Sequence, residues 1–302
     1  MQVSYSATSS QKPNDRRDVS HAVQTHIGVA GAGVMGRAIA AELAARGAEV
    51  ILYDSDKHVL ERCGDEIQAL IRMRALMQGV PQDQYAALRI RVSGDIGDLS
   101  ASSLVIENIV ERAEEKRSLY RELDAACRPA TIFVVNSSTF KISEVASWTG
   151  RAERVIGIHF MNPVALIAYA EVVAGENTST TTRNEAERLL AFMGKRALHV
   201  GDMPGYVSNR IYMLTVNEAI LCLQDCVADV STIDQLFFHC FGWKAGPLAT
   251  ADLIGLDTVL FSLDALFKAF GQEKFKPAQL LVEMVDKGLF GQKSGKGFYE
   301  YD

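Results

Sequence analysis

The chain has 302 residues and a formal net charge of −6 at pH 7, with 48% hydrophobic and 23% charged residues. This composition is typical of a globular protein with one large domain or two ordinary ones. No basic block exceeds two adjacent residues and no apolar run approaches the roughly 18 residues of a spanning helix, so we expect neither a nucleic-acid nor a membrane partner.

Five scattered cysteines form no CxxC pair and no metal-ligand spacing. They therefore predict no metal site and a reducing compartment, the cytoplasm. The N-terminal residues 1–22 are polar and Ser-rich and lack the apolar core of a signal peptide, so we expect a disordered tail.

Short apolar runs alternate with segments of helical spacing over residues 23–200. Strands are expected at 25–30, 48–54, 102–109, 130–136, 154–160, 168–173 and 195–202, and helices at 34–47, 57–78, 81–92, 111–127, 142–148 and 182–194. This alternation predicts an α/β fold with a Rossmann-type, doubly wound and mostly parallel sheet.

The pattern changes after Pro204-Gly205, which supplies a break. Residues 210–227, 230–242, 247–271 and 277–288 all have helical spacing, and no clear strand signal follows. We therefore predict two domains, an α/β domain over 23–200 and an all-α domain over 201–302.

A glycine-rich loop follows the first predicted strand and opens the first predicted helix. It has the pattern G-x-G-x-x-G, in which the loop residues are Gly31, Gly33, Val34, Met35 and Gly36. In this context the glycines allow a tight turn, close backbone approach to a pyrophosphate and close helix–strand packing. The loop thus predicts a dinucleotide site.

The second predicted strand ends in Asp54, eighteen residues after Gly36 (54 − 36). A carboxylate here can bond a ribose 2′-hydroxyl and repels a 2′-phosphate, and no arginine follows in "DSDKHV". We therefore expect the cofactor to be NAD rather than NADP.

Polar side chains gather where the later predicted strands end. In chain order they are Glu107, Glu111, Asn136, Ser137, Ser138, His159 and Asn162. In a doubly wound sheet, ligands bind beyond the carboxyl ends of the strands, so these residues are candidates for an active site.

His159 and Glu171 lie twelve positions apart (171 − 159), with Asn162-Pro163 between them. If the chain reverses at Asn162-Pro163, Glu171 can reach His159 and form an acid/base pair for hydride chemistry. Taken alone, a histidine on a strand is more often structural, and Glu171 could equally face solvent. His26 and His199 lie on predicted strands without evident acidic partners.

The chain resembles the L-3-hydroxyacyl-CoA dehydrogenase family from about residue 25 to residue 301. "GVAGAGVMGRAIA" resembles the nucleotide loop of that family, and "GIHFMNPV" and "AEVV" are similar to its catalytic stretch. "NSSTFKISEVA", "MPGYVSNRI" and "GQKSGKGFYEY" resemble further family elements in the same order. The resemblance implies NAD-dependent oxidation of a short-chain 3-hydroxyacyl thioester to the 3-oxoacyl thioester.

The resemblance also implies roles for single residues. His159 would be the catalytic base and Glu171 its orienting partner, while Ser138 and Asn209 would bond the reacting oxygen. Asn162 would support the site near the nicotinamide and, like Ser138, contact the cofactor. Three further residues match family positions around the cofactor: Glu111, Lys116 and Lys293. On sequence alone, Glu111 and Lys116 are more simply explained as surface charges.

The chain departs from the family where coenzyme A is held. The helix after the second strand usually carries lysines and a serine, but here it reads "EIQALIRMRALMQG", with Leu70 and Met77 near those positions. Arg72 and Arg74 could substitute for them. A later family lysine is replaced by Ala168, and Phe241 and Trp243 enter a loop of the helical domain.

Three functions follow from this comparison. The first is a dehydrogenase acting on a short acyl-CoA, and the second is the same chemistry on a substrate tethered to an acyl carrier protein, such as a glyceryl unit. The third is an NAD-binding protein without catalysis, although Ser138, His159, Asn162, Glu171 and Asn209 are all present. The resemblance further implies a homodimer formed by the helical domain.

Overall fold

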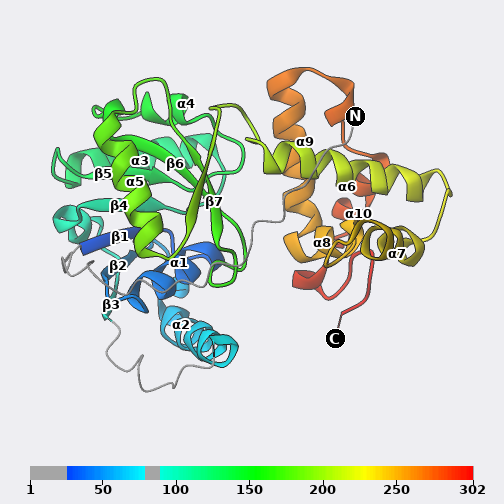
Figure 1. Cartoon of the computed structure of the whole chain (residues 1–302), viewed down its shortest axis with the longest axis horizontal. Helices are drawn as coiled ribbons and strands as arrows, with labels where there is room; N and C mark the ends of the chain where they lie inside the picture. The colour runs from blue at the N-terminus through cyan, green and yellow to red at the C-terminus, as the bar shows by residue number, and fades with distance from the viewer. Residues whose placement is uncertain (1–25, 79–88, 302) are drawn as a thin grey trace, which may run out of the picture.

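The computed structural model describes residues 26–78 and 89–301. A sheet with helices on both faces occupies one side of the molecule, and a group of helices occupies the other (Figure 1). This arrangement confirms the predicted fold class. The predicted tail, residues 1–22, and residues 81–88 of a predicted helix lie outside the described residues.

The sheet has eight strands in the order β3-β2-β1-β4-β5-β6-β7-β8. They are β1 (His26–Ala30), β2 (Glu49–Tyr53), β3 (Arg89–Ser93), β4 (Leu104–Glu107), β5 (Ile132–Val135), β6 (Val155–Phe160), β7 (Tyr169–Val173) and β8 (Arg196–Val200). The first six run parallel, β7 is antiparallel to β6, and β8 is parallel to β7. The order reverses between β1 and β4, the position where such sheets bind ligands.

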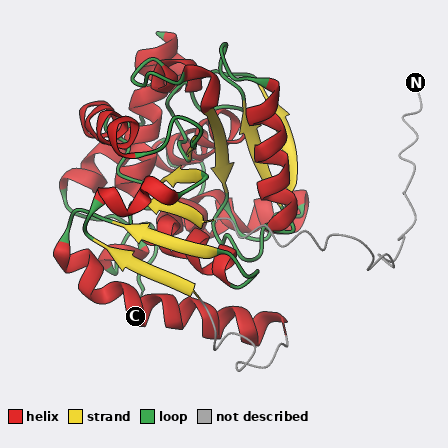
Figure 2. Cartoon of the chain, turned by 90° about the vertical axis from the view of Figure 1, so that its left-hand side faces the viewer, coloured by secondary structure: helices red, strands yellow, loops and turns green. Residues whose placement is uncertain are grey.

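Helices cover both faces of the sheet (Figure 2). One face packs against α1 (Val34–Ala44), α2 (Lys57–Gln78) and α5 (Thr180–Phe192). The other face packs against α3 (Ala113–Ala126), α4 (Ile142–Ala146) and the 3₁₀ turn Ile96–Ala101. Because both faces are covered, the inner strands are apolar runs rather than alternating ones.

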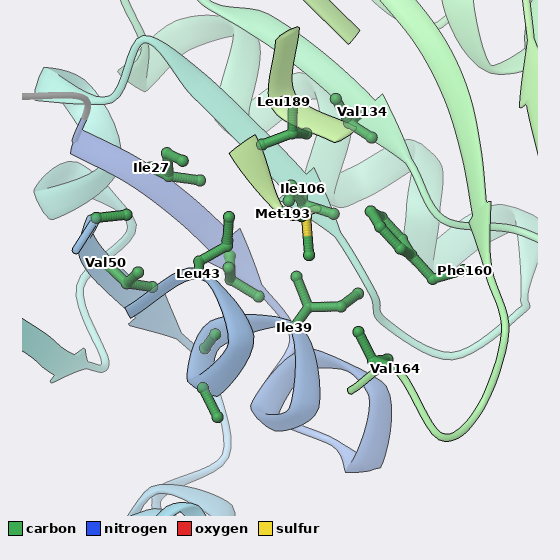
Figure 3. Packing of buried hydrophobic residues seen from close by; sticks show 14 of the residues in the cluster. Ile27, Ile39, Leu43, Val50, Ile106, Val134, Phe160, Val164, Leu189 and Met193 are labelled. Carbon is green, nitrogen blue, oxygen red and sulfur yellow. The ribbon is translucent and has the colours of Figure 1, made fainter. Parts of the chain in front are cut away.

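The larger of the two sheet cores lies under α1 and α5. Ile39 and Leu43 of α1 pack toward Ile106 of β4, with Leu189 and Met193 of the α5 region beside them (Figure 3). Each fully buried side chain of this size contributes roughly 1.5–3 kcal/mol through removal from water. This packing holds the start of α1, and with it the glycine loop, against the sheet.

The edge strand β3 corrects one prediction. The sequence pattern predicted a helix over residues 81–92, but Arg89–Ser93 pairs in parallel with Glu49–Tyr53 of β2. Ion pairs of Arg89 with Glu49 and of Arg91 with Asp98 accompany this pairing. Strand pairing joins residues far apart in sequence, and local helical spacing cannot anticipate it.

The second part of the molecule consists of α6 (Ser208–Gln224), α7 (Val230–Phe241), α8 (Pro247–Ile254), α9 (Leu256–Phe270) and α10 (Gln279–Asp286). The segment predicted as one helix over 247–271 is two helices, since Gly255 between them has φ +102°. A side chain rarely adopts that conformation, so the glycine permits the break. Within the two described ranges, no helix is both long and apolar enough to cross a membrane.

Candidate active site

His159 and Glu171 face each other across the β6–β7 pair. The antiparallel register places them directly opposite, and His159 Nδ1 lies 2.8 Å from Glu171 Oε2. The chain reverses through the loop that contains Asn162-Pro163, as predicted. Both side chains are nearly buried, with 12% and 5% of their surfaces exposed.

The Glu171 carboxylate is held in its ionised form. Burial alone would raise its pKa, but hydrogen bonds from His159 and Ser208 outweigh burial and lower the pKa to about 2. Ser208 donates from its backbone N (2.9 Å) and its Oγ (2.6 Å), and Val207 N donates at 3.1 Å. An ionised carboxylate carries no proton, so the hydrogen bond to Glu171 must come from Nδ1–H of His159.

That assignment leaves Nε2 of the neutral His159 ring with a free lone pair. Ser138 Oγ lies 3.0 Å from Nε2, so the serine hydroxyl donates to it. The three side chains therefore form one continuous chain of hydrogen bonds, from Ser138 through His159 to Glu171. The basic nitrogen of the ring faces Ser138 and is oriented by the carboxylate behind it.

Glu111 fixes the loop that carries Ser138. Its carboxylate accepts hydrogen bonds from Ser138 N and Thr139 N, both at 3.0 Å, from Thr139 Oγ1 at 2.9 Å, and from the Ser137 hydroxyl. Burial opposes ionisation of Glu111, but Lys116 and these hydroxyls prevail and lower its pKa. Glu111 is thus a structural anchor of the site rather than a surface charge.

Lys116 is completely buried behind Glu111. Its Nζ lies 2.7 and 2.8 Å from the two oxygens of Glu107 and 3.1 Å from Glu111 Oε2. Tyr120 OH donates to Glu107 at 3.2 Å. Burial favours the neutral amine, yet the two carboxylates dominate and raise the pKa of Lys116. Its predicted contact with the cofactor stays a prediction.

Three further predicted residues come from α6, from the β6–β7 loop and from the C-terminal segment. Asn209 Nδ2 of α6 approaches Ser138 O at 3.4 Å, which brings the helical part to the catalytic loop. Asn162 is exposed in the β6–β7 loop. Lys293 pairs with Asp257 and lies over the Phe290 ring, within the helical part. The cofactor roles of Asn162 and Lys293 stay predictions.

The glycine loop has the backbone geometry that a dinucleotide requires. Gly31 has φ +97°, and a Cβ there would lie 2.7 Å from the backbone of Asn108. A Cβ on Gly36 would lie 1.8 Å from Gly31 O, so only glycine lets α1 pack this closely. By contrast, no atom lies within 4 Å of a Cβ built on Gly33, which leaves open space at the helix N-terminus.

The groups around that open space suit a pyrophosphate and a ribose. Gly33 is the N-cap of α1, no side chain caps the helix, and Val34 and Met35 carry no charge that would repel a phosphate. Asp54 accepts hydrogen bonds from Ala32 N at 2.7 Å and Asp56 N at 2.9 Å, which fixes the carboxylate at the end of β2. These residues fit the phosphates and ribose of a dinucleotide.

A row of hydrogen bonds connects the glycine loop to the catalytic strand. Asn108 N donates to Ala30 O at 2.7 Å, and Asn136 Nδ2 donates to Asn108 Oδ1 at 2.7 Å. Phe160 N, next to His159, donates to Asn136 Oδ1 at 3.1 Å. The ends of β1, β4, β5 and β6 are therefore held in one line, and the dinucleotide site and the histidine share one edge of the sheet.

The outer face of α2 differs from the rest of this edge. Arg74, a candidate substitute for the missing lysines, is buried against α1, where its Nε lies 2.8 Å from Glu42 Oε2. It is therefore unavailable to a coenzyme A phosphate. Arg72 is exposed, and so are three large apolar side chains, which are Met73, Leu76 and Met77.

The histidines of β1 and β8 prove to have acidic partners that the sequence did not reveal. His26 Nε2 lies 2.9 Å from Glu49 Oε2, and His199 Nε2 lies 2.5 Å from Glu187 Oε1. Both pairs are largely exposed, unlike His159 and Glu171. In the described part of the chain, no group of three or more His, Cys, Asp or Glu side chains is arranged to hold a metal.

Sequence reasoning did not identify Ser208 as part of this site and gave Glu107 no role. Ser208 directly precedes Asn209 in the quoted "VSNR", so its neighbour carried the signal. Glu107 ends an apolar strand, and a carboxylate at such a position requires a buried partner. The partner of Ser208, which is Glu171, and that of Glu107, which is Lys116, could not be named without the fold.

Comparisons with known proteins agree with this geometry. Residues 26–203 match the model of the 3-hydroxyacyl-CoA dehydrogenase NAD-binding domain, and residues 205–301 match that of the C-terminal domain. A probable 3-hydroxybutyryl-CoA dehydrogenase from Bacillus subtilis is 38% identical over 91% of this chain and 96% of its own length.

Two crystal structures extend the similarity to the fold. FadB2 of M. tuberculosis is 32% identical, with a TM-score of 0.87 over 92% of this chain and 99% of its own. The (S)-3-hydroxybutyryl-CoA dehydrogenase PaaH1 of Ralstonia eutropha is 34% identical, with a TM-score of 0.84 and the same coverage. The protein therefore belongs to the 3-hydroxyacyl-CoA dehydrogenase family of NAD-dependent oxidoreductases.

Proposed function

We propose that the protein oxidises a short-chain (S)-3-hydroxyacyl thioester to the 3-oxoacyl thioester, with His159 as the general base. The observation that carries this proposal is the hydrogen-bonded chain Ser138–His159–Glu171 at the same sheet edge as the glycine loop. NAD, held by the glycine loop and Asp54, supplies the hydride acceptor when it is bound.

The protein groups divide the proton transfer among them. Nε2 of His159 receives the proton of the substrate 3-hydroxyl, and the ring becomes an imidazolium. Glu171 is ionised and accepts from Nδ1–H at 2.8 Å, so it stabilises that charge without itself taking the proton. Ser138 Oγ and Asn209 Nδ2 lie where they can donate to the oxygen as it becomes a carbonyl.

A Ser–His–Glu chain also occurs in serine hydrolases, so its geometry requires a second test. Acyl transfer needs free backbone N–H groups that stabilise an oxyanion. Here the N–H groups of Ser138 and Thr139 both donate to Glu111. That use of the donors favours hydride transfer over acyl transfer.

The acyl carrier is the second part of the proposal. The names of the relatives favour coenzyme A, and we infer a coenzyme A thioester as the first substrate class. The outer face of α2 favours the alternative, a substrate on an acyl carrier protein. That face of α2 presents Met73, Leu76 and Met77 instead of lysines. A substrate on a carrier protein has no adenosine phosphates, so lysines are not needed to bind them.

The decisive assay follows NADH formation with 3-hydroxybutyryl-CoA beside 3-hydroxybutyryl- and glyceryl-loaded carrier proteins. We expect turnover of the coenzyme A ester by the wild type and loss of turnover in His159→Ala, while NAD binding is preserved. His199→Ala is the matched control, because His199 also pairs with a glutamate but is exposed. Turnover by His159→Ala at the wild-type rate would refute the proposed base.

Turnover of the carrier-bound substrates alone would identify the carrier protein, rather than coenzyme A, as the acyl carrier. The proposed reaction would stay the same. No turnover on either class, with NAD bound normally, would support the third function considered from the sequence, an NAD-binding protein without catalysis. The chemistry and the carrier are thus tested separately in one experiment.

We also infer a homodimer formed through the helical part. α6 and α7 line an apolar groove of about 680 Å³, and Leu236 of α7 lines it with half of its surface exposed. Phe238 and Phe241 of the same helix are also exposed. Exposed apolar surface of this kind typically marks a protein interface. Sedimentation equilibrium of the wild type and Phe238→Lys tests it, since the variant should shift toward monomer.

The cytoplasm is the compartment we propose. All five cysteines are free thiols in the structure, and secreted chains of this kind more often carry disulfides. Fractionation of the native host, with the protein found outside the cytoplasm, would contradict this.

A further inference from the structure

Ser208, the first residue of α6, contacts the Glu171 carboxylate through both its backbone and its side chain. Its N donates to Oε1 at 2.9 Å, and its Oγ donates to Oε2 at 2.6 Å. Val207 N adds a second donor to Oε1 at 3.1 Å, and His159 Nδ1 a second donor to Oε2 at 2.8 Å. Each carboxylate oxygen therefore has two donors, and three of the four come from the helical part.

The two side-chain donors share one oxygen. Ser208 Oγ–H and His159 Nδ1–H both donate to Oε2. A hydroxyl that donates to a carboxylate oxygen withdraws part of its negative charge, so the oxygen attracts a neighbouring imidazolium less strongly. The strength with which Glu171 stabilises protonated His159 thus depends on whether the hydroxyl of residue 208 is present.

We propose that Ser208 is a positioning residue that lowers the proton affinity of His159 through the shared oxygen of Glu171. This inference rests on the proposed function, because the kinetic meaning of that proton affinity requires His159 to be the base. Ser208 keeps the ring neutral, and therefore able to accept the substrate proton, at a lower pH than Glu171 alone would allow.

Other ionisable groups packed around the ring do not replace Glu171 in this effect. The Tyr206 ring lies 5.8 Å from the His159 ring, and burial raises its pKa well above the ordinary value, so it is neutral near pH 7. Glu111, in the β4–α3 loop, is engaged by Lys116 and by the hydroxyls of Ser137 and Thr139 in the β5–α4 loop.

The charged groups of the segment that enters α6 are engaged elsewhere. Asp202 accepts hydrogen bonds from Ile142 N and from Ser143, and Arg210 stacks on Phe270 with its guanidinium carbon 4.4 Å from the ring centre. Among the described residues, Glu171 is the carboxylate that contacts His159.

The test separates the hydroxyl from the size of the side chain. Ser208→Thr and Ser208→Val have nearly the same shape, but only threonine keeps a hydroxyl. The pKa of His159 is read directly by NMR titration of ring-labelled protein, and its signal among the six histidines is identified as the one missing in His159→Gln.

We expect Ser208→Val and Ser208→Ala to raise the pKa of His159 by about 0.5 pH unit or more, and Ser208→Thr to match the wild type. The acidic limb of the kcat/KM profile should move upward by the same amount in the valine and alanine variants. Equal titration of the threonine and valine variants, or a downward shift in valine, would overturn the inference.

Failure of the proposed function would look different. If His159→Ala retained turnover, the base assignment would fall, while the NMR shift would still report whether Ser208 acts on the ring. A merely structural role of Ser208 predicts a lower melting temperature and weaker NAD binding with no shift of the titration. Melting temperature and NAD affinity are therefore measured on all three variants.

Discussion

The two ends of the proposed substrate site are built in opposite ways. At the end of β6 and β7, the polar groups of the proposed reaction are buried and hydrogen-bonded, and Glu171 alone accepts four donors. Toward the end of α2, by contrast, the apolar side chains of Met73, Leu76 and Met77 are exposed, with Leu76 84% exposed. The proposed chemistry therefore depends on many mutually dependent contacts, whereas the proposed contact of α2 with the acyl carrier depends on few.

This difference predicts how each end responds to mutation. A buried polar group that loses its partner keeps its full desolvation cost, so single changes at the chemical end should have large effects. Water replaces the contacts of an exposed side chain when that side chain is removed. Substitutions on α2 should therefore have small effects. The predictions below follow that gradient.

The largest effect is expected for Lys116→Met. Removal of the ammonium leaves Glu107 and Glu111 buried without their cation, which should lower the free energy of unfolding by about 3–5 kcal/mol. Urea denaturation measures it. Arg188→Met, which breaks an exposed pair with Glu185, is the control and should cost less than about 1 kcal/mol. Equal costs would contradict the contrast between buried and exposed charge pairs.

Glu171→Gln should lower kcat by roughly a hundredfold or more, because the amide cannot stabilise the imidazolium as the carboxylate does. Steady-state kinetics at saturating NAD measures the loss. Glu187→Gln changes the same kind of residue beside the exposed His199 and should leave kcat unchanged. A comparable loss in both variants would argue that the Glu171 effect is not local.

The same carboxylate predicts a dependence of stability on pH. The folded-state pKa of Glu171 is about 2, below its ordinary value of 4.5. The stability that Glu171 contributes is therefore fully present above about pH 4.5 and is lost as the pH falls toward 2. Between pH 5 and pH 3, the difference in unfolding free energy between the wild type and Glu171→Gln should shrink; a constant difference would contradict the assignment.

Gly33→Ala should raise the dissociation constant of NAD by about tenfold, or 1.4 kcal/mol, because the added methyl group enters the space left for the pyrophosphate. The fold should be unaffected, since no protein atom lies within 4 Å of that methyl group. Titration calorimetry with NAD measures the affinity. Gly64→Ala on α2 is equally unobstructed and should bind NAD normally.

The smallest effect is expected on α2. Arg72→Ala should raise KM for the coenzyme A thioester about two- to fivefold at low salt and leave kcat unchanged, since an exposed cation contributes little and is screened. The KM for a carrier-bound substrate, measured beside it, shows which partner uses this face. An unchanged KM for both substrates would remove Arg72 from the binding surface.

Local patterns in the sequence determined the order of the elements and the dinucleotide loop. Apolar periodicity located every described strand of the sheet except β3, and the spacing of Gly31, Gly33 and Gly36 predicted the turn before α1. These features depend on neighbours in the chain, so local reasoning reaches them. The position of His159 and Glu171 on either side of Asn162-Pro163 made them candidates for an acid/base pair, and the resemblance to a family implied their separate roles.

Tertiary structure alone decided which polar groups meet. The antiparallel return of β7 places Glu171 opposite His159, and the start of α6 brings Ser208 onto the same carboxylate. It also buries Arg74 against Glu42 and turns Lys116 from an apparent surface charge into a buried one. Hydrogen bonds and burial join residues distant in sequence, and no local pattern carries that information.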